Sequence, residues 1–145
     1  MTGPHQVSVV IPVYQGERTL AAVVEELAAS VAIRVSPGGR QYQVAEVLLV
    51  HDCGPDASDD TIRHLCAEHD WARPVWLSRN FGQHYAISAG LDACRGDWAV
   101  VMDCDMQDRP EEIPRLYDRA MEGFDVVCAR RGRRKDPLWK RCASV

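Results

Sequence analysis

The sequence has no long apolar run and few aromatic residues. No stretch approaches the roughly 20 apolar residues of a membrane-spanning helix, and MTGPHQVSVVIPVY at the N-terminus lacks the features of a secretory signal. We therefore expect a cytoplasmic protein. The 145 residues are 46% hydrophobic and 26% charged, which is typical of one soluble globular domain over residues 1–145 rather than of a disordered chain.

Several common motifs are also missing. IPVYQGE stands where a dinucleotide-binding enzyme would have Gly-x-Gly-x-x-Gly, and neither Gly-x-x-x-x-Gly-Lys-Ser/Thr nor Gly-x-Ser-x-Gly occurs. These absences argue against dinucleotide dehydrogenases, P-loop NTPases and serine hydrolases. The six cysteines lack the paired Cys-x-x-Cys spacing of structural zinc sites, so we expect free thiols.

The charge is distributed unevenly, although the net charge is only -4. Residues 130–141 contain seven of the 17 Lys and Arg residues but a single acid, Asp136. The rest of the chain is acidic. A basic tail of this kind (residues 130–145) either binds phosphate or anionic lipid headgroups or is simply a solvated run of charge.

Two hydrophobic periodicities alternate along the chain. Short β-branched segments predict strands, and each of the first four is followed by apolar residues at helical spacing. The predicted strands are residues 7–14, 45–52, 75–78, 98–104 and 125–129, and the predicted helices are residues 17–33, 58–70, 82–94 and 111–123.

The helical spacing also predicts which side chains face the core. They are Leu20, Val23, Leu27 and Val31 in the first helix, Ile62 and Leu65 in the second, and Ile87 and Leu91 in the third. Ser58 is a candidate N-cap, and Gly123 is placed as a helix stop.

This alternation predicts an α/β fold, a Rossmann-like, mostly parallel sheet with flanking helices, because parallel neighbours need crossover helices. In such sheets ligands bind beyond the carboxyl ends of the strands. The polar clusters that follow the strands are residues 14–17, 52–58, 79–83 and 103–108.

Asp103 and Asp105 stand two residues apart after the fourth predicted strand. If the chain turns there, both carboxylates can reach one point, and a divalent cation relieves their repulsion. Mg²⁺ or Mn²⁺ usually completes its shell with water and phosphate oxygens, which suggests a nucleoside diphosphate as partner. A solvated turn is the alternative for so short a motif.

Two further clusters have candidate binding groups. Asp52 could accept a hydrogen bond from a base or a ribose hydroxyl, or could serve a turn. Arg79 and Asn80, with Gly82 at the start of the third predicted helix, could present a guanidinium and backbone N–H groups to phosphate. A helix entry without ligand is equally compatible with this segment, and His84 is more often structural than a proton carrier.

Four segments in this order resemble a known family. They are VSVVIPVYQGERTL, LLVHDCGPDASDDT, LSRNFGQHYAISAGLDACRGDWAVVMDCDMQDRPEEIPRL and DVVCARRGRRKD. In order and spacing they resemble the nucleotide-sugar-binding half of family 2 inverting glycosyltransferases, which have the GT-A fold. Within that family they look most like the polyprenyl-phosphate hexosyltransferase branch, which includes dolichol-phosphate mannosyltransferases and undecaprenyl-phosphate glucosyltransferases.

The resemblance implies three groups of site residues. The nucleotide-sugar group consists of Pro12, Tyr14, Glu17, Asp52, Arg79, Asn80, Gly82, Asp103 and Gln107. Asp103 and Asp105 match the Asp-x-Asp that binds the metal and the diphosphate and are the catalytic acids; Asp108 matches a polar residue that follows it. Arg131, Arg134 and Lys135 fall where this branch has basic residues that meet the acceptor phosphate.

The resemblance also implies a reaction. A hexose would pass from a UDP- or GDP-sugar to a polyprenyl phosphate or a saccharide, with inversion, at the cytoplasmic face of the membrane and with no nucleic-acid partner. An ionised phosphate acceptor needs no strong base, whereas a hydroxyl does. Asp108 and Asp136 both stay open as that base.

The chain departs from the family pattern at three places. His51 stands where an acid or Asn is commoner, Arg109 stands where a second proline is commoner, and the chain stops at Val145, where the family continues with an acceptor-binding half. A catalytically incomplete nucleotide-sugar-binding module is therefore the alternative. A phospho-accepting receiver domain would need an acid pair after the first strand, where VYQGE stands.

Overall fold

A mixed, mostly parallel sheet organises residues 3–129, which are the residues that the computed structural model describes. Its strands are β1 (His5–Val13), β2 (Arg34–Val35), β3 (Gln41–His51), β4 (Ala72–Trp76) and β5 (Trp98–Val101). The helices are α1 (Leu20–Ala28), α2 (Ser58–Glu68), α3 (Gln83–Asp92) and α4 (Ile113–Ala120), the last preceded by a 3-10 turn, η1 (Pro110–Glu112).

The strand order is β2-β3-β1-β5, and β4 also pairs with β3. β1 pairs in parallel with β3 and with β5, and β4 runs parallel to β3, whereas the short β2 is antiparallel to the start of β3. This arrangement confirms the expected α/β fold. Since the long strands run the same way, their carboxyl ends meet at one edge of the sheet.

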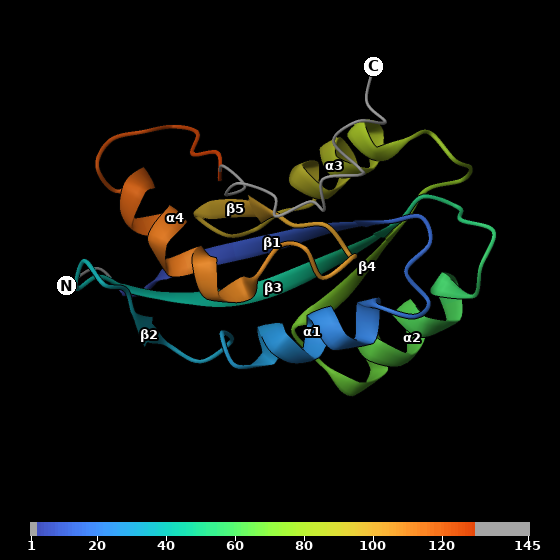
Figure 1. Ribbon diagram of the computed structural model, residues 1–145, viewed down its shortest axis with the longest axis horizontal. Helices are drawn as coiled ribbons and strands as arrows, with labels where there is room; N and C mark the ends of the chain where they lie inside the picture. The colour runs from blue at the N-terminus through green and yellow to red at the C-terminus, as the bar shows by residue number, and fades with distance from the viewer. Residues whose placement is uncertain (1–2, 130–145) are drawn as a thin grey trace, which may run out of the picture.

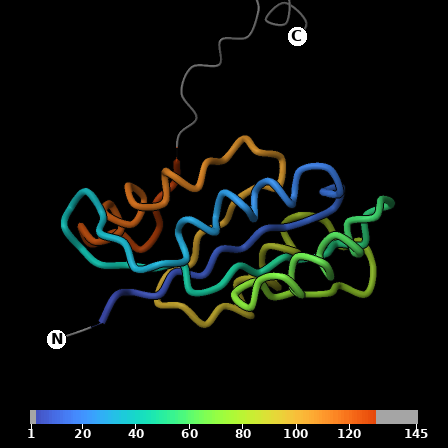
Figure 2. The backbone as a smooth tube through the Cα atoms, turned by 90° about the horizontal axis from the view of Figure 1, so that it is seen from below, coloured from blue at the N-terminus to red at the C-terminus, as the bar shows by residue number. Residues whose placement is uncertain are grey.

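Helices cover both faces of the sheet (Figure 1). One core cluster joins odd-numbered residues of β1, such as Val9 and Ile11, to α1, α2 and α4, and a smaller cluster joins Val10 of β1 to α3. Figure 2 shows α1 and α2 side by side along the strands. The helices have 8 to 11 residues, and over this part of the chain none is long and apolar enough to cross a membrane.

The helical stripes are confirmed in α1 and α2 but not in α3. Leu20, Val23 and Leu27 are buried, as are Ile62 and Leu65. The expectation that Ile87 and Leu91 face the sheet is wrong: the buried residues of α3 are Ala86 and Gly90, and Leu91 is 43% exposed. A Cβ on Gly90 would lie 2.3 Å from Val10 Cγ1, so α3 packs closely on the sheet through its small residues.

The strand expected at residues 125–129 is also wrong. These residues have no regular structure, and Val126 is 78% exposed. The fifth strand is instead β2, which a turn over residues 36–40 folds back onto β3, with hydrogen bonds Ser36 N–H to Arg40 C=O and Gly39 N–H to Ser36 C=O. A β-branched run does not form a strand without a pairing neighbour.

Some boundaries and one cap also differ from the expectations. β5 ends at Val101 rather than at residue 104, and α1 is shorter than residues 17–33. The N-cap of α2 is Ala57, without a side-chain cap, and Ser58 is the first helical residue; its hydroxyl donates to Asp56 and accepts from the N–H of Gly16. Gly123 does follow α4 with a φ of 103°, in the left-handed region that favours glycine at a helix end.

Candidate functional site

The loops after β1 and β3 are tied together at the carboxyl edge of the sheet. The backbone N–H of Gly16 donates to the hydroxyl oxygen of Ser58 at 2.8 Å. The backbone N–H of Glu17 donates to Oδ2 of Asp56 at 3.0 Å, and the Glu17 carboxylate accepts in return from the N–H of Ala57 at 3.4 Å. These bonds place the predicted site residue Glu17 against the loop that begins at Asp52.

Close backbone contact reinforces this junction. A Cβ on Gly54 would lie 1.3 Å from the carbonyl oxygen of Tyr14, so only glycine allows the two loops to approach this closely. Tyr14 keeps 46% of its surface exposed beside the contact. Burial alone would raise the pKa of Asp56, but hydrogen bonds from the Ser58 hydroxyl and from backbone N–H groups outweigh it, so the pKa lies below the ordinary value and the carboxylate stays ionised.

Asp52 is buried and binds the loop before α3. Its Oδ1 accepts from the backbone N–H of Phe81 at 2.8 Å, and its Oδ2 accepts from that of Gly82 at 2.9 Å. A carboxylate at a helix N-terminus interacts favourably with the helix dipole. The N–H groups that the sequence suggested for phosphate are therefore occupied by Asp52, and contact between Asp52 and a nucleobase stays a prediction.

The loop after β5 joins the same edge. The hydroxyl of Thr19 donates to the carbonyl oxygen of Cys104 at 2.5 Å, and the side-chain amide of Gln83 donates to Oδ1 of Asp103 at 3.0 Å. The backbone N–H of Asp103 donates in turn to Oδ2 of Asp108 at 2.9 Å. All four polar clusters expected from the sequence are thus linked by hydrogen bonds.

Asp103 and Asp105 lie on a tight turn at the end of β5. Oδ1 of Asp105 accepts from the backbone N–H of Gln107 at 3.0 Å. Met106, between Asp105 and Gln107, has a φ of 65°. Asp105 is exposed, and Asp103 is half-buried. Burial, with the negative charges of these two acids, raises the pKa of the Cys104 thiol.

The donor chemistry of this turn fits Mg²⁺ or Mn²⁺. Within residues 3–129 no three His, Cys, Asp or Glu side chains converge as a complete metal site. Two carboxylates alone match the way in which Mg²⁺ is usually held, with water and substrate phosphate oxygens completing the shell. Asp103 and Asp105 are therefore the residues that could hold a cation together with a diphosphate.

Other predicted residues surround this edge. Pro12 is buried near the end of β1. The pairing of β1 with β5 ends at Val10, so the missing N–H of Pro12 interrupts no hydrogen bond between these two strands. The guanidinium of Arg79 lies 4.4 Å from the ring centroid of Phe81, and Asn80 is exposed. These positions leave both polar side chains of the loop at the surface.

His51 is a buried departure from the family pattern. Its ring packs edge-on against Trp76, with centroids 5.4 Å apart, and its Nε2 has no hydrogen-bond partner within residues 3–129. An aromatic imidazole ring packs against an indole ring better than a carboxylate would. His51 therefore takes part in packing next to Asp52.

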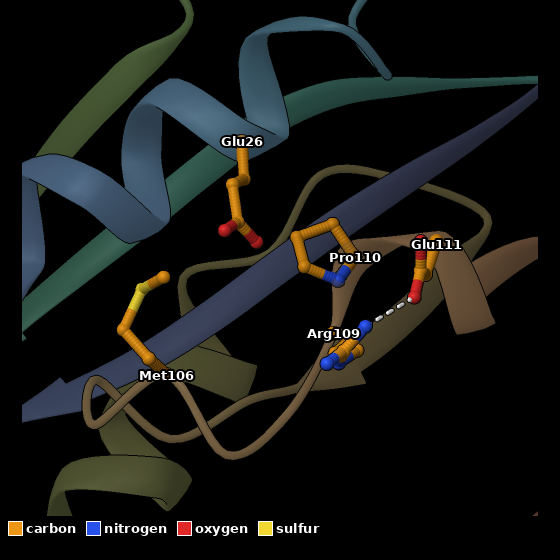
Figure 3. A pocket seen from close by; sticks show the side chains of 5 residues that line it. All are labelled: Glu26, Met106, Arg109, Pro110 and Glu111. Carbon is orange, nitrogen blue, oxygen red and sulfur yellow. Dashed lines mark hydrogen bonds and ion pairs between the residues drawn. The ribbon is translucent and has the colours of Figure 1, made fainter.

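A pocket of about 360 Å³ lies between α1 and the loop after β5 (Figure 3). It is lined by Glu26, Met106, Arg109, Pro110 and Glu111, and Arg109 forms a 3.0 Å ion pair with Glu111. None of the predicted site residues lines this pocket. The pocket is therefore adjacent to the turn that contains Asp103 and Asp105, and it is distinct from the junction of the four polar loops.

The sequence did not single out Gln83, Thr19 or Gly54, although all three hold this edge together. Gln83 had a signal, because it is the last residue of the polar cluster 79–83 and lies in the first turn of the third predicted helix. Thr19 and Gly54 had none, since their partners are backbone carbonyls distant in the chain. Arg131, Arg134 and Lys135 lie outside the described residues.

Solved structures define the class of protein. The structure superimposes with a TM-score of 0.62, at 21% identity, on glucosyl-3-phosphoglycerate synthase from Mycobacterium tuberculosis in complex with Mn²⁺, UDP and glucosyl-3-phosphoglycerate, covering 82% of this chain and 40% of that one. A mannosyltransferase from Pyrobaculum calidifontis in complex with GDP-Man and Mn²⁺ gives a TM-score of 0.59 at 17% identity, with 72% and 28% covered. The fold is therefore that of the GT-A glycosyltransferases.

The sequence defines the family. Residues 8–141 match the family model described as Glycosyl transferase family 2, and the chain belongs to that family. It is 41% identical over 139 residues to an undecaprenyl-phosphate 4-deoxy-4-formamido-L-arabinose transferase of Aeromonas hydrophila, and 42% identical over 143 residues to one of Klebsiella pneumoniae. The alignments cover 95% and 96% of this chain but only 40% and 41% of those proteins.

Proposed function

We propose that this chain is a metal-dependent glycosyltransferase that transfers a hexose from a nucleoside-diphosphate sugar to a polyprenyl phosphate or a saccharide, with inversion. One observation carries the proposal: the four polar loops meet at one edge of the sheet, where Asp103 and Asp105 share a turn. The names of the relatives support undecaprenyl phosphate as acceptor. The chain spans about 40% of the length of those relatives.

The donor is a nucleoside-diphosphate sugar with UDP or GDP as its nucleotide. Structures of the same fold contain UDP in one case and GDP-Man in another, each with Mn²⁺. The relatives are named for transfer of 4-deoxy-4-formamido-L-arabinose, so that sugar should be compared with hexoses. Tyr14, Glu17 and Asp52 are the residues proposed to bind the nucleotide.

The reaction is a single in-line displacement at the anomeric carbon. An oxygen of the acceptor phosphate forms the new bond, and the bond to the nucleoside diphosphate breaks with inversion. Asp103 and Asp105 would hold a divalent cation, which would supply positive charge to neutralise the charge that develops on the leaving diphosphate. The acceptor oxygen is already ionised, so the protein needs to orient it rather than deprotonate it.

Orientation of the acceptor is the role proposed for the basic tail. Arg131, Arg134 and Lys135 carry charge complementary to a lipid phosphate and to an anionic membrane surface. Replacing Arg131 and Arg134 by Ala should weaken binding to anionic vesicles while leaving nucleotide affinity intact. Equal vesicle binding by the variant would remove this role.

Calorimetric titration of UDP and GDP, each with and without Mn²⁺, tests the proposed donor site. We expect one nucleotide to bind in a metal-dependent way, and Asp105→Asn to abolish the metal dependence. Asp92→Asn, which removes an exposed acid of α3, is the matched control and should bind as the wild type does. Binding of neither nucleotide under any metal condition would disprove the proposal.

A second candidate is a nucleotide-sugar-binding module that requires a further polypeptide segment for transfer. The coverage of only 40% of the relatives favours it. Binding of the nucleotide sugar with neither transfer to undecaprenyl phosphate nor hydrolysis would support this module. Transfer by the 145-residue chain alone would exclude it.

A further inference from the structure

Gln83 connects the start of α3 to the proposed cation site. Its side-chain Nε2 donates to Oδ1 of Asp103 at 3.0 Å. The backbone of Asp103 is held separately, because its N–H donates to Oδ2 of Asp108 at 2.9 Å. Gln83 belongs to a different element from the two acids, so its hydrogen bond fixes the Asp103 carboxylate relative to the body of the sheet.

The position of Gln83 is itself fixed. It is the first residue of α3 and follows Gly82, whose φ of 95° lies in the left-handed region. The N–H groups of Phe81 and Gly82 both donate to the buried carboxylate of Asp52. A continuous connection therefore runs from Asp52 at the end of β3, through the start of α3, to Asp103 at the end of β5.

We infer that Gln83 is a positioning residue that orients the Asp103 carboxylate for a divalent cation and a diphosphate; this rests on the proposed function. A neutral amide suits the task, because it donates an N–H without charge. A lysine at position 83 would repel the cation. A glutamate there would repel the two acids when no cation is bound. Loss of a hydrogen-bond partner of a metal ligand lowers metal affinity by about 10- to 100-fold, and the exposure of Gln83 favours the lower end.

Gln83→Met tests this inference, because it keeps the length of the side chain and removes the donor. Mn²⁺ is titrated calorimetrically into protein saturated with whichever of UDP and GDP the wild type binds. We expect the Mn²⁺ affinity to fall about tenfold, with the metal-free nucleotide affinity and the thermal unfolding midpoint unchanged. Gln41→Met, at the exposed amino end of β3, is the matched control and should change neither affinity.

A double-mutant cycle shows whether Gln83 acts through Asp103. In the Asp103→Asn background, Gln83→Met should cause no further loss of Mn²⁺ affinity. An undiminished effect in that background, or an unchanged Mn²⁺ affinity in Gln83→Met alone, overturns the inference while the proposed function stands. Failure of the wild type to bind either nucleotide with Mn²⁺ overturns both.

Discussion

The carboxylate of Asp52 accepts a hydrogen bond from the backbone N–H of Gly82 at 2.9 Å, which joins the end of β3 to the start of α3. The second oxygen binds the neighbouring N–H of Phe81, and the side chain is buried. The loop that contains Arg79 and Asn80 is therefore held by a buried carboxylate side chain. The contribution of Asp52 to a nucleotide site is at least partly indirect, through this loop.

Asp52→Ala should destabilise the protein by about 3 kcal/mol, because the backbone N–H groups of Phe81 and Gly82 both lose their hydrogen bonds to the carboxylate. The stability of Asp52→Asn should lie between that of the wild type and that of Asp52→Ala, since the amide NH2 group that replaces one carboxylate oxygen cannot accept a hydrogen bond. Denaturant unfolding measures both variants, with Asp92→Ala as an exposed control. A loss below about 1 kcal/mol in Asp52→Ala would show that the anchor is dispensable.

Gly54→Ala should cost at least about 3 kcal/mol, because a Cβ there would meet the carbonyl oxygen of Tyr14 at 1.3 Å and the two backbones would have to separate. Gly3→Ala is the matched control, since a Cβ at Gly3 has no neighbour within 4 Å. Thermal unfolding distinguishes them. Equal midpoints for the two variants would contradict the close approach of the loops.

The fold was predictable from the sequence where the periodicity was strong. The β-branched run of β1 predicts a buried strand, and the apolar stripe through Leu20 and Leu27 predicts a helix that covers it. Residues 125–129 also contain adjacent valines but form no strand, since strand pairing depends on a neighbour that composition does not encode. The buried face of α3 could not be predicted from its apolar residues, because the helix packs on the sheet through Gly90, which has no side chain.

The site was predictable as a set of loops but not as a network. The rule that ligands bind at the carboxyl ends of parallel strands located all four clusters. The individual bonds could not be derived, because Asp52 and Gln83 reach partners 30 and 20 residues away. Spacing along the chain gives no measure of such distances in space.

Glu46 should make stability depend on pH. Burial alone would raise its pKa, but hydrogen bonds from Ser8, Arg95 and Arg73 hold it below the usual value of 4.5. A lowered pKa in the folded state means that the stabilisation is complete above the unfolded-state pKa and is lost as the pH falls through the folded-state pKa.

The difference in unfolding free energy between the wild type and Glu46→Gln should therefore shrink as the pH falls from about 7 to about 3. At neutral pH we expect a difference of about 2 kcal/mol, from the lost charge-assisted hydrogen bonds. Glu25→Gln, on the exposed side of α1, is the control and should show little difference at either pH. A constant difference across this range would mean that Glu46 does not titrate as the structure requires.

Thr19→Val should loosen the turn that contains Asp103 and Asp105, because the Thr19 hydroxyl donates to the carbonyl oxygen of Cys104 between them. Valine keeps the shape and removes the donor, so we expect a stability loss of about 1 kcal/mol together with weaker Mn²⁺-dependent nucleotide binding. Thr61→Val is the matched control: its hydroxyl donates to the carbonyl oxygen of Ala57, the N-cap of α2, at 3.1 Å. Calorimetry should show that only Thr19→Val changes the metal-dependent affinity. Equal affinities in the two variants would mean that the turn keeps its geometry without the hydrogen bond from Thr19.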